Sequence, residues 1–169
     1  MDPAIRYAPE KPFPPYAFVP GRHPHPIRDP EGHSFGQEVE TLPAPLPGEL
    51  AGNIHFRFGL DLFNFGYYWE AHEAWEELWH AAGRKGNLAD LLKGLIHLAA
   101  AGVKAREGNP NGVIRHARRA GELFRITNRD ILRRIAEELA SEPPADDRVT
   151  TDGFPLLAVR LGPEDFSNL

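Results

Sequence analysis

The chain has 169 residues, of which 41% are hydrophobic and 25% charged, as expected for one globular domain with its own core. Its net charge is −5 and it contains no cysteine, so disulfide bridges, thiolate metal sites and cysteine catalysis are excluded. It shows neither a signal peptide nor an apolar run of bilayer length, so we expect a cytoplasmic protein without a membrane partner.

Residues 1–47 form a proline-rich arm that contains twelve of the 17 prolines. Proline fixes φ and removes a backbone donor, so this stretch is expected to be extended or rich in turns. Aromatic residues, among them Phe13, Tyr16 and Phe18, make it too apolar for a free tail. We therefore predict an extended strap that packs on the rest of the chain.

Residues 48–142 show apolar residues at helical spacing and predict about five helices. The predicted helices cover about 48–65, 67–82, 87–107 and 110–126, with a fifth that is capped by Thr127 or Asn128 and ends before Pro143. The sharpest helix boundary is Gly108-Asn109-Pro110. The glycine ends the third predicted helix, the asparagine is the N-cap of the fourth, and the proline occupies its first helical position. Residues 143–169 have no period and predict an irregular C-terminal tail. The fold class is therefore all-α, a compact bundle built from α-hairpins.

The second predicted helix carries the main candidate site. His72 and Glu76 are spaced i, i+4, which places them one turn apart at the border between the apolar and the polar face. Trp69 and Trp79 flank them, so the pair is expected to be partly desolvated. Imidazole beside carboxylate suits a metal-ligand pair or an acid–base couple. The metalloprotease pattern HExxH is not met, because Glu76 stands where its second histidine belongs.

The third predicted helix is apolar except for a stripe that contains Lys93 and His97. Buried polar groups need partners, so we predict that Lys93 or His97 meets His72 or Glu76 across the helix seam. A buried polar network that only fixes helix register is the alternative interpretation. The catalytic candidates are thus His72, Glu76, Lys93 and His97. The candidate ligands of a divalent metal ion are His72, Glu76, His80 and His97. Further residues predicted to line the groove are Asn64, Trp69, Glu73 and Trp79.

Two other groups of polar side chains lie on or near the second predicted helix. Glu70 and Glu77 are interpreted as part of a solvated face. The arm adds His23, His25 and His33, and a strap that crosses the second helix can deliver one of them to the site.

The run FNFGYYWEAHEAWEELW (63–79), followed by LLKGLIHLAAAGVKAREGNPNGV (91–113), resembles the domain-of-unknown-function family 309 over about residues 50–125. The resemblance implies a compact helical bundle without an assigned activity. It implies a polar signature of Asn64, Glu70, His72, Glu73, Glu76, Trp79, Lys93, Gly94, His97, Gly108 and Asn109. Where relatives commonly have glutamine, this chain has His97, which is titratable and able to bind metal.

Three functions remain open, and the sequence does not decide whether the protein is an enzyme. The first is a binding or scaffolding module with a polar groove around His72 and Glu76, for a peptide, protein or small anion. The second is a metal-assisted or acid–base hydrolase that uses the same residues. The third is nucleic-acid contact through the basic face of the fourth helix, which the overall acidity and the lack of interleaved aromatic residues disfavour.

Overall fold

The computed structural model describes residues 5–144, 156–157 and 160–167, and within these residues the chain forms five α-helices and no strand. The helices are α1 (Ile54–Asn64), α2 (Tyr68–Ala81), α3 (Asn87–Arg106), α4 (Pro110–Ile126) and α5 (Asp130–Ser141). The 3₁₀ helices η1 (Leu50–Gly52) and η3 (Pro163–Phe166) precede and follow them. The prediction of an all-α bundle is confirmed.

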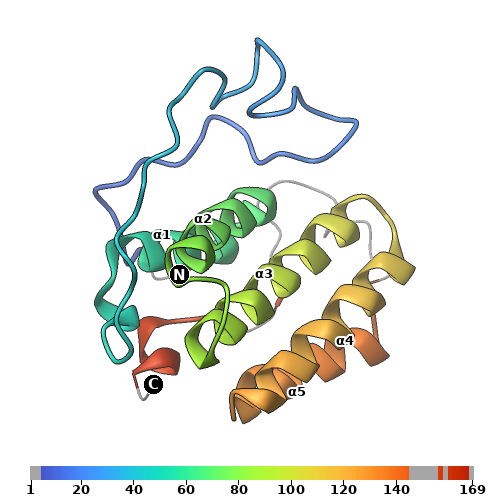
Figure 1. The fold of residues 1–169 in the computed structure, drawn as a ribbon. Coiled ribbons are helices and arrows are strands. Elements are labelled where there is room, and N and C mark those ends of the chain that lie inside the picture. Colours follow the sequence, from blue (N-terminus) through green and yellow to red (C-terminus); the bar gives the residue numbers. More distant parts are fainter. Residues whose placement is uncertain (1–4, 145–155, 158–159, 168–169) are drawn as a thin grey trace.

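Each helix packs on its neighbour in the chain, from α1 on α2 to α4 on α5, as in a series of α-hairpins. Figure 1 shows α3 between α2 and α4, with α5 beside α4. The central helix α3 is therefore covered on two sides, which explains why its sequence is almost entirely apolar. None of the described helices is both long and apolar enough to cross a bilayer.

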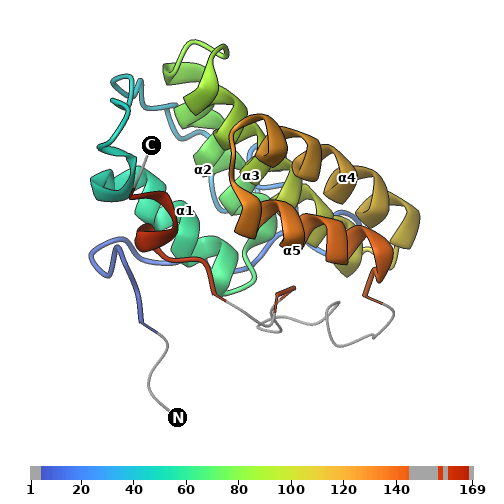
Figure 2. The same cartoon turned by 90° about the horizontal axis from the view of Figure 1, so that it is seen from below.

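The core is built around Trp75, whose side chain has no solvent exposure. The rings of Phe56 and Phe63 lie 6.4 and 5.8 Å from the Trp75 ring, measured between centroids, and join α1 to α2. Phe166 of η3 packs edge-on against Phe56 at 4.9 Å, so η3 lies against α1 (Figure 2). Aromatic side chains of this size contribute most of the apolar area that stabilises a small core.

Two helix starts differ from the prediction. The helix predicted from residue 48 begins only at Ile54, because the Asn53 side chain accepts hydrogen bonds from the backbone N–H groups of His55 and Phe56. The residue that caps α5 is Arg129, not Thr127 or Asn128. Thr127 is buried and its hydroxyl donates to the Leu123 carbonyl, so it completes α4 instead. By contrast, Asn109 caps α4 ahead of Pro110 as predicted.

The strap, defined as residues 5–47, lies on the side of α1 and α2 that faces away from α4 and α5 (Figure 1). It is held at two buried carboxylates. Asp61 of α1 accepts the backbone N–H groups of Tyr7 and Ala8, at 2.8 and 2.9 Å. Glu70 of α2 accepts the backbone N–H of Phe18 at 2.9 Å. The strap is therefore bound to the helices through its backbone, in addition to its aromatic side chains.

Candidate functional site

The first feature of the site is a group of three side chains on one face of α2. His72 Nε2 lies 3.9 Å from Oε2 of Glu76, and His72 Nδ1 lies 3.2 Å from Oε1 of Glu73. One potential ligand atom from each of the three residues lies within 4.8 Å of the others. The His72 side chain is 27% exposed, so the group can be reached from solvent. We call His72, Glu73 and Glu76 the α2 triad.

Helical geometry explains why these three residues meet. Positions 72, 73 and 76 lie on adjacent rows of one helix surface, and Ala71 and Trp75 on the opposite rows are fully buried in the core. The triad is thus fixed on a helix whose orientation the core determines. His72 Nδ1 is itself buried and faces Glu73 Oε1 at 3.2 Å, without the geometry of a hydrogen bond. An ion at the α2 triad would therefore require the His72 and Glu73 side chains to adjust.

The second feature is a pair of histidines on the neighbouring helices. His97 of α3 and His116 of α4 approach to 3.1 Å between their Nδ1 atoms, so one ring donates an N–H to the other. Burial, together with the nearby His116 and Lys93, lowers the pKa of His97 to about 4. Burial and the charges of Arg115 and Lys104 also lower the pKa of His116. Both rings are therefore neutral at pH 7.

The histidine pair lies on the two helices that follow α2, and α3 packs directly on α2. His72 is the weakest of the named electrostatic influences that lower the pKa of His97 and of His116. Within the described residues, no hydrogen bond or ion pair joins Lys93 or His97 to His72 or Glu76. Lys93 instead lies over the Trp79 indole, with Nζ 4.1 Å from the ring centroid.

This pair makes the stability of the protein pH-dependent. The pKa of His97 is lower in the folded chain than its ordinary value of 6.5, so the unfolded state binds the proton more readily. The contribution of neutral His97 to the free energy of unfolding is therefore fully present above pH 6.5, and it is lost as the pH falls toward 4. Wild type is expected to lose unfolding free energy when the pH falls from 7 to 5. In His97→Gln this loss should be smaller by about 1 kcal/mol, a value that allows for the partial exposure of the His97 side chain.

Urea unfolding of wild type and variant at the two pH values measures this difference. The exposed His80 provides the control, because His80→Gln changes a histidine outside the pair and is expected to leave the pH dependence unchanged. Equal pH dependence in wild type and His97→Gln would contradict the assignment of acid sensitivity to the pair.

The remaining candidates of the sequence prediction lie elsewhere. His80 is exposed, and its Nδ1 accepts a hydrogen bond from Arg84 at 2.8 Å. Asn64 uses its side chain to donate to and accept from the Leu161 backbone, so it holds the segment before η3. Trp69 packs edge-on against Phe18 and His25 of the strap. These residues shape the surroundings of the α2 triad but do not join it.

The interpretation of Glu70 as a solvated residue is wrong, because its side chain is only 6% exposed. Its Oε1 receives the Phe18 backbone N–H and also lies 2.9 Å from His33 Nε2. Of the three arm histidines, His33 is thus the one that reaches α2 through a polar contact. Helical periodicity could not reveal this, because Glu70 lies on the polar arc of α2 and it is the strap that buries it.

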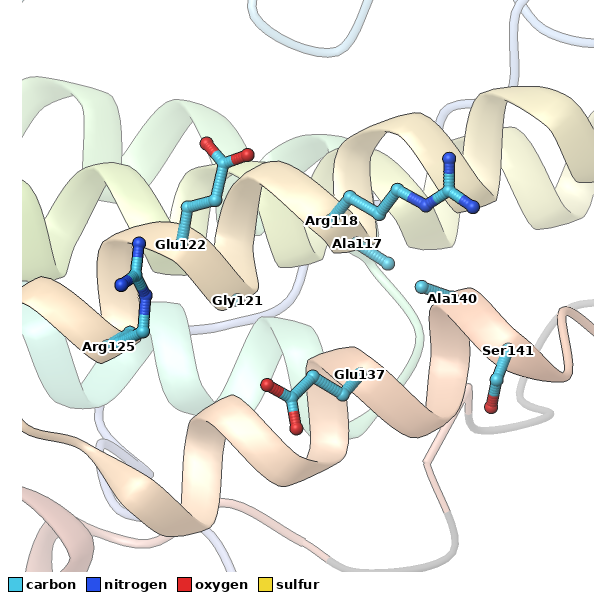
Figure 3. Close-up of a pocket in the computed structure, with 8 residues that line it drawn as sticks. All are labelled: Ala117, Arg118, Gly121, Glu122, Arg125, Glu137, Ala140 and Ser141. Carbon is cyan, nitrogen blue, oxygen red and sulfur yellow. The ribbon is translucent and has the colours of Figure 1, made fainter.

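The basic face of α4 borders a shallow groove of about 390 Å³ between α4 and α5. Figure 3 shows Ala117 and Ala140 facing each other between the two helices, with the charged groups of Arg118 and Glu122 directed away from α5. Glu122 also pairs with Arg119 at 2.7 Å. Glu122 is the single carboxylate of α4 and pairs with one of the four arginines of the helix, so the face stays basic.

Comparison with known proteins agrees with the resemblance. Residues 56–116 match the family described as “Domain of unknown function (DUF309)”. The matched segment runs from α1 to α4 and contains the α2 triad, His97 and His116. No curated protein and no solved structure matches the chain significantly. The family similarity therefore covers the whole candidate site but assigns no activity to it.

Proposed function

We propose that the protein is a small helical binding module that holds its ligand through a divalent transition-metal ion at the α2 triad. The observation that carries this proposal is the convergence of one imidazole and two carboxylates within 4.8 Å on a partly exposed helix face. Imidazole nitrogen and carboxylate oxygen are common ligands of Zn²⁺ in proteins.

The surroundings of the α2 triad support this proposal. His97 and His116 are neutral at pH 7, so they add no positive charge that would repel a cation from His72. Glu73 and Glu76 are each about one third exposed, so their carboxylates can reorient toward an ion without leaving the helix surface. Three protein ligands would leave a coordination position open for an anionic group such as a carboxylate or phosphate. A small anion or an acidic side chain is therefore the ligand that this site fits.

Metal titration tests the proposal directly. Isothermal titration of the tag-free protein with ZnCl₂ is expected to show one ion per chain. His72→Ala should weaken this binding by more than about 100-fold, which is the upper end of the loss that outer-shell partners cause. His80→Ala is the matched control, because it removes a histidine of the same helix that lies outside the α2 triad. Wild-type protein that binds no Zn²⁺, or equal losses in the two variants, would overturn the proposal.

A metal-dependent hydrolase is the second candidate, favoured by the neutral His97–His116 pair beside the α2 triad. A neutral imidazole near a metal site can accept a proton from an attacking water. Hydrolysis of p-nitrophenyl acetate and bis-p-nitrophenyl phosphate by the Zn²⁺-loaded protein separates the two functions. Turnover that disappears in both His72→Ala and His97→Gln supports the enzyme, whereas Zn²⁺ binding without turnover supports the binding module.

A further inference from the structure

The strap brings a serine and a histidine into one chain of hydrogen bonds with a buried glutamate of α2. His33 Nε2 lies 2.9 Å from Oε1 of Glu70, and His33 Nδ1 lies 2.8 Å from Oγ of Ser34. Neither contact involves a residue of the α2 triad. We call Ser34, His33 and Glu70 the strap triad.

The partners of the His33 ring determine which of its nitrogens carries the proton. A carboxylate only accepts hydrogen bonds, so we infer that Nε2, which faces Glu70, is the N–H nitrogen. In the neutral imidazole the other nitrogen, Nδ1, is then an acceptor, and the Ser34 hydroxyl donates to it. A hydroxyl that donates to an imidazole held by a carboxylate is the arrangement of a nucleophile, its general base and an orienting group.

The surrounding strap fixes the orientation of His33. Its ring packs against the Tyr16 ring with 4.6 Å between centroids, and its backbone N–H donates to the Tyr16 hydroxyl at 3.1 Å. The backbone N–H of Ser34 donates to the Pro26 carbonyl at 2.9 Å. The hydroxyl and the imidazole are therefore held by a hydrogen-bonded turn, as the groups of a catalytic site must be.

The strap triad borders a cavity of about 360 Å³ between the strap and helices α1 and α2. Its size falls in the range of small-molecule sites in proteins, which is roughly 300–1,000 Å³. Ser34 is partly exposed, whereas the side chains of His33 and Glu70 are 4% and 6% exposed. The serine is thus the member of the strap triad that a molecule in the cavity can reach, and its base and the carboxylate are screened from water.

The lining of this cavity indicates which acyl compounds fit. Phe58, Leu62 and Trp69 form an apolar wall that suits a short hydrocarbon chain. The lining glutamates, at positions 38, 40, 70, 73 and 77, disfavour anionic substrates. Lys11 also lines the cavity, and its ammonium group is carried on a flexible chain that can move toward an oxyanion. The substrate class that this lining favours is a small, uncharged carboxylic ester.

We propose that the strap triad is a nucleophilic site at which Ser34 takes up the acyl group of a small neutral ester. Ser34 Oγ attacks the carbonyl carbon while His33 Nδ1 takes the hydroxyl proton, and Glu70 stabilises the imidazolium that forms. The bond from the carbonyl carbon to the alcohol oxygen then breaks, and His33 gives its proton to the departing alcohol. Attack of water on the acyl group, with His33 again taking and returning a proton, releases the carboxylic acid and restores the serine.

This inference is independent of the metal ion proposed for the α2 triad, because no step of the acyl transfer requires an ion. Glu73 belongs to the α2 triad and also lines the cavity, but it has no part in the strap triad. The two sites can therefore be tested separately.

Covalent labelling tests the inference directly. The full chain is treated with a fluorophosphonate, which phosphonylates activated serine hydroxyls with loss of fluoride, and the modified residue is identified by peptide mass spectrometry. We expect one adduct per chain, on Ser34, that is absent in Ser34→Ala. His33→Gln should slow the labelling by about 100-fold, because it removes the general base. The matched control is Ser141→Ala, since the Ser141 hydroxyl is exposed and donates to the Glu138 carbonyl instead of a histidine.

Hydrolysis of p-nitrophenyl butyrate in the presence of EDTA measures turnover without metal. It is expected to disappear in Ser34→Ala and to persist in His72→Ala, which separates this activity from metal-dependent hydrolysis at the α2 triad. Glu70 acts through His33 and does not touch the substrate. Glu70→Gln should therefore lower kcat at least about tenfold and leave KM unchanged.

Ser34→Ala removes only a partly exposed hydroxyl, so a loss of labelling in this variant reports the nucleophile and not unfolding. Failure to find the adduct on Ser34 in wild type, or ester turnover that Ser34→Ala leaves intact, would overturn the inference. Labelling of His33→Gln at the wild-type rate would do so too. The strap triad would then be a purely structural contact between the strap and α2.

Discussion

Gly59→Ala is expected to destabilise the protein by about 3 kcal/mol, although alanine is the better helix former. A Cβ at position 59 would lie 2.2 Å from Nε1 of Trp75, and 2.7 Å from its Cδ1, which is far inside van der Waals contact. Trp75 is the largest fully buried side chain of the core, so its indole has no free space into which it can move. The close approach of α1 to α2 therefore requires glycine at this position.

Gly121→Ala is the matched control, since it makes the same substitution inside a helix where space is available. Its Cβ would meet Ala136 at 3.7 Å, an ordinary contact, and we expect a gain of about 0.5–1 kcal/mol from helix propensity. Urea unfolding of both variants measures the contrast. Similar effects of the two substitutions would show that the α1–α2 contact is looser than the structure indicates.

The helices of this fold could be predicted from sequence because local signals mark most of their ends. Gly66 and Gly108 have φ angles of 85° and 67°, a conformation that favours glycine, and each follows the end of a helix. The apolar pattern predicts the start of α1 too early, because residues 50–52 continue that pattern as a 3₁₀ turn. Periodicity alone does not distinguish that turn from the first turn of an α-helix.

The candidate site could be predicted only where it lies within one helix. His72, Glu73 and Glu76 are close in sequence, so helical spacing is sufficient to bring them together. The His97–His116 contact joins residues 19 positions apart on different helices, and no local pattern indicates it. Glu70 was assigned to solvent because the sequence does not show where the strap crosses α2.

Asp61 was missed for a different reason, although a signal was present. It lies between Leu60 and Leu62 in α1, and all three side chains are almost completely buried. A carboxylate within an apolar run must find hydrogen-bond donors, and in this protein the strap backbone supplies them. Asp61 and Glu70 thus have the same role, since each converts a helix surface into an acceptor for the strap.

Asp61→Ala is therefore expected to be among the most damaging single substitutions, with a loss of about 3–5 kcal/mol. It would leave the backbone N–H groups of Tyr7 and Ala8 without their acceptor and would remove the partner of Arg6, whose Nε lies 3.3 Å from Asp61 Oδ2. The free energy of unfolding in urea measures the loss. The strap contains trypsin cleavage sites at Arg22 and Arg28, so faster cleavage there in the variant would show that the strap is the segment that has loosened.

Arg6→Ala separates the backbone contacts from the ion pair, because it removes a partner that is 22% exposed while both backbone hydrogen bonds to Asp61 remain. We expect this variant to lose only about 1 kcal/mol. Equal losses in the two variants would assign the stabilisation to the ion pair rather than to the backbone acceptor.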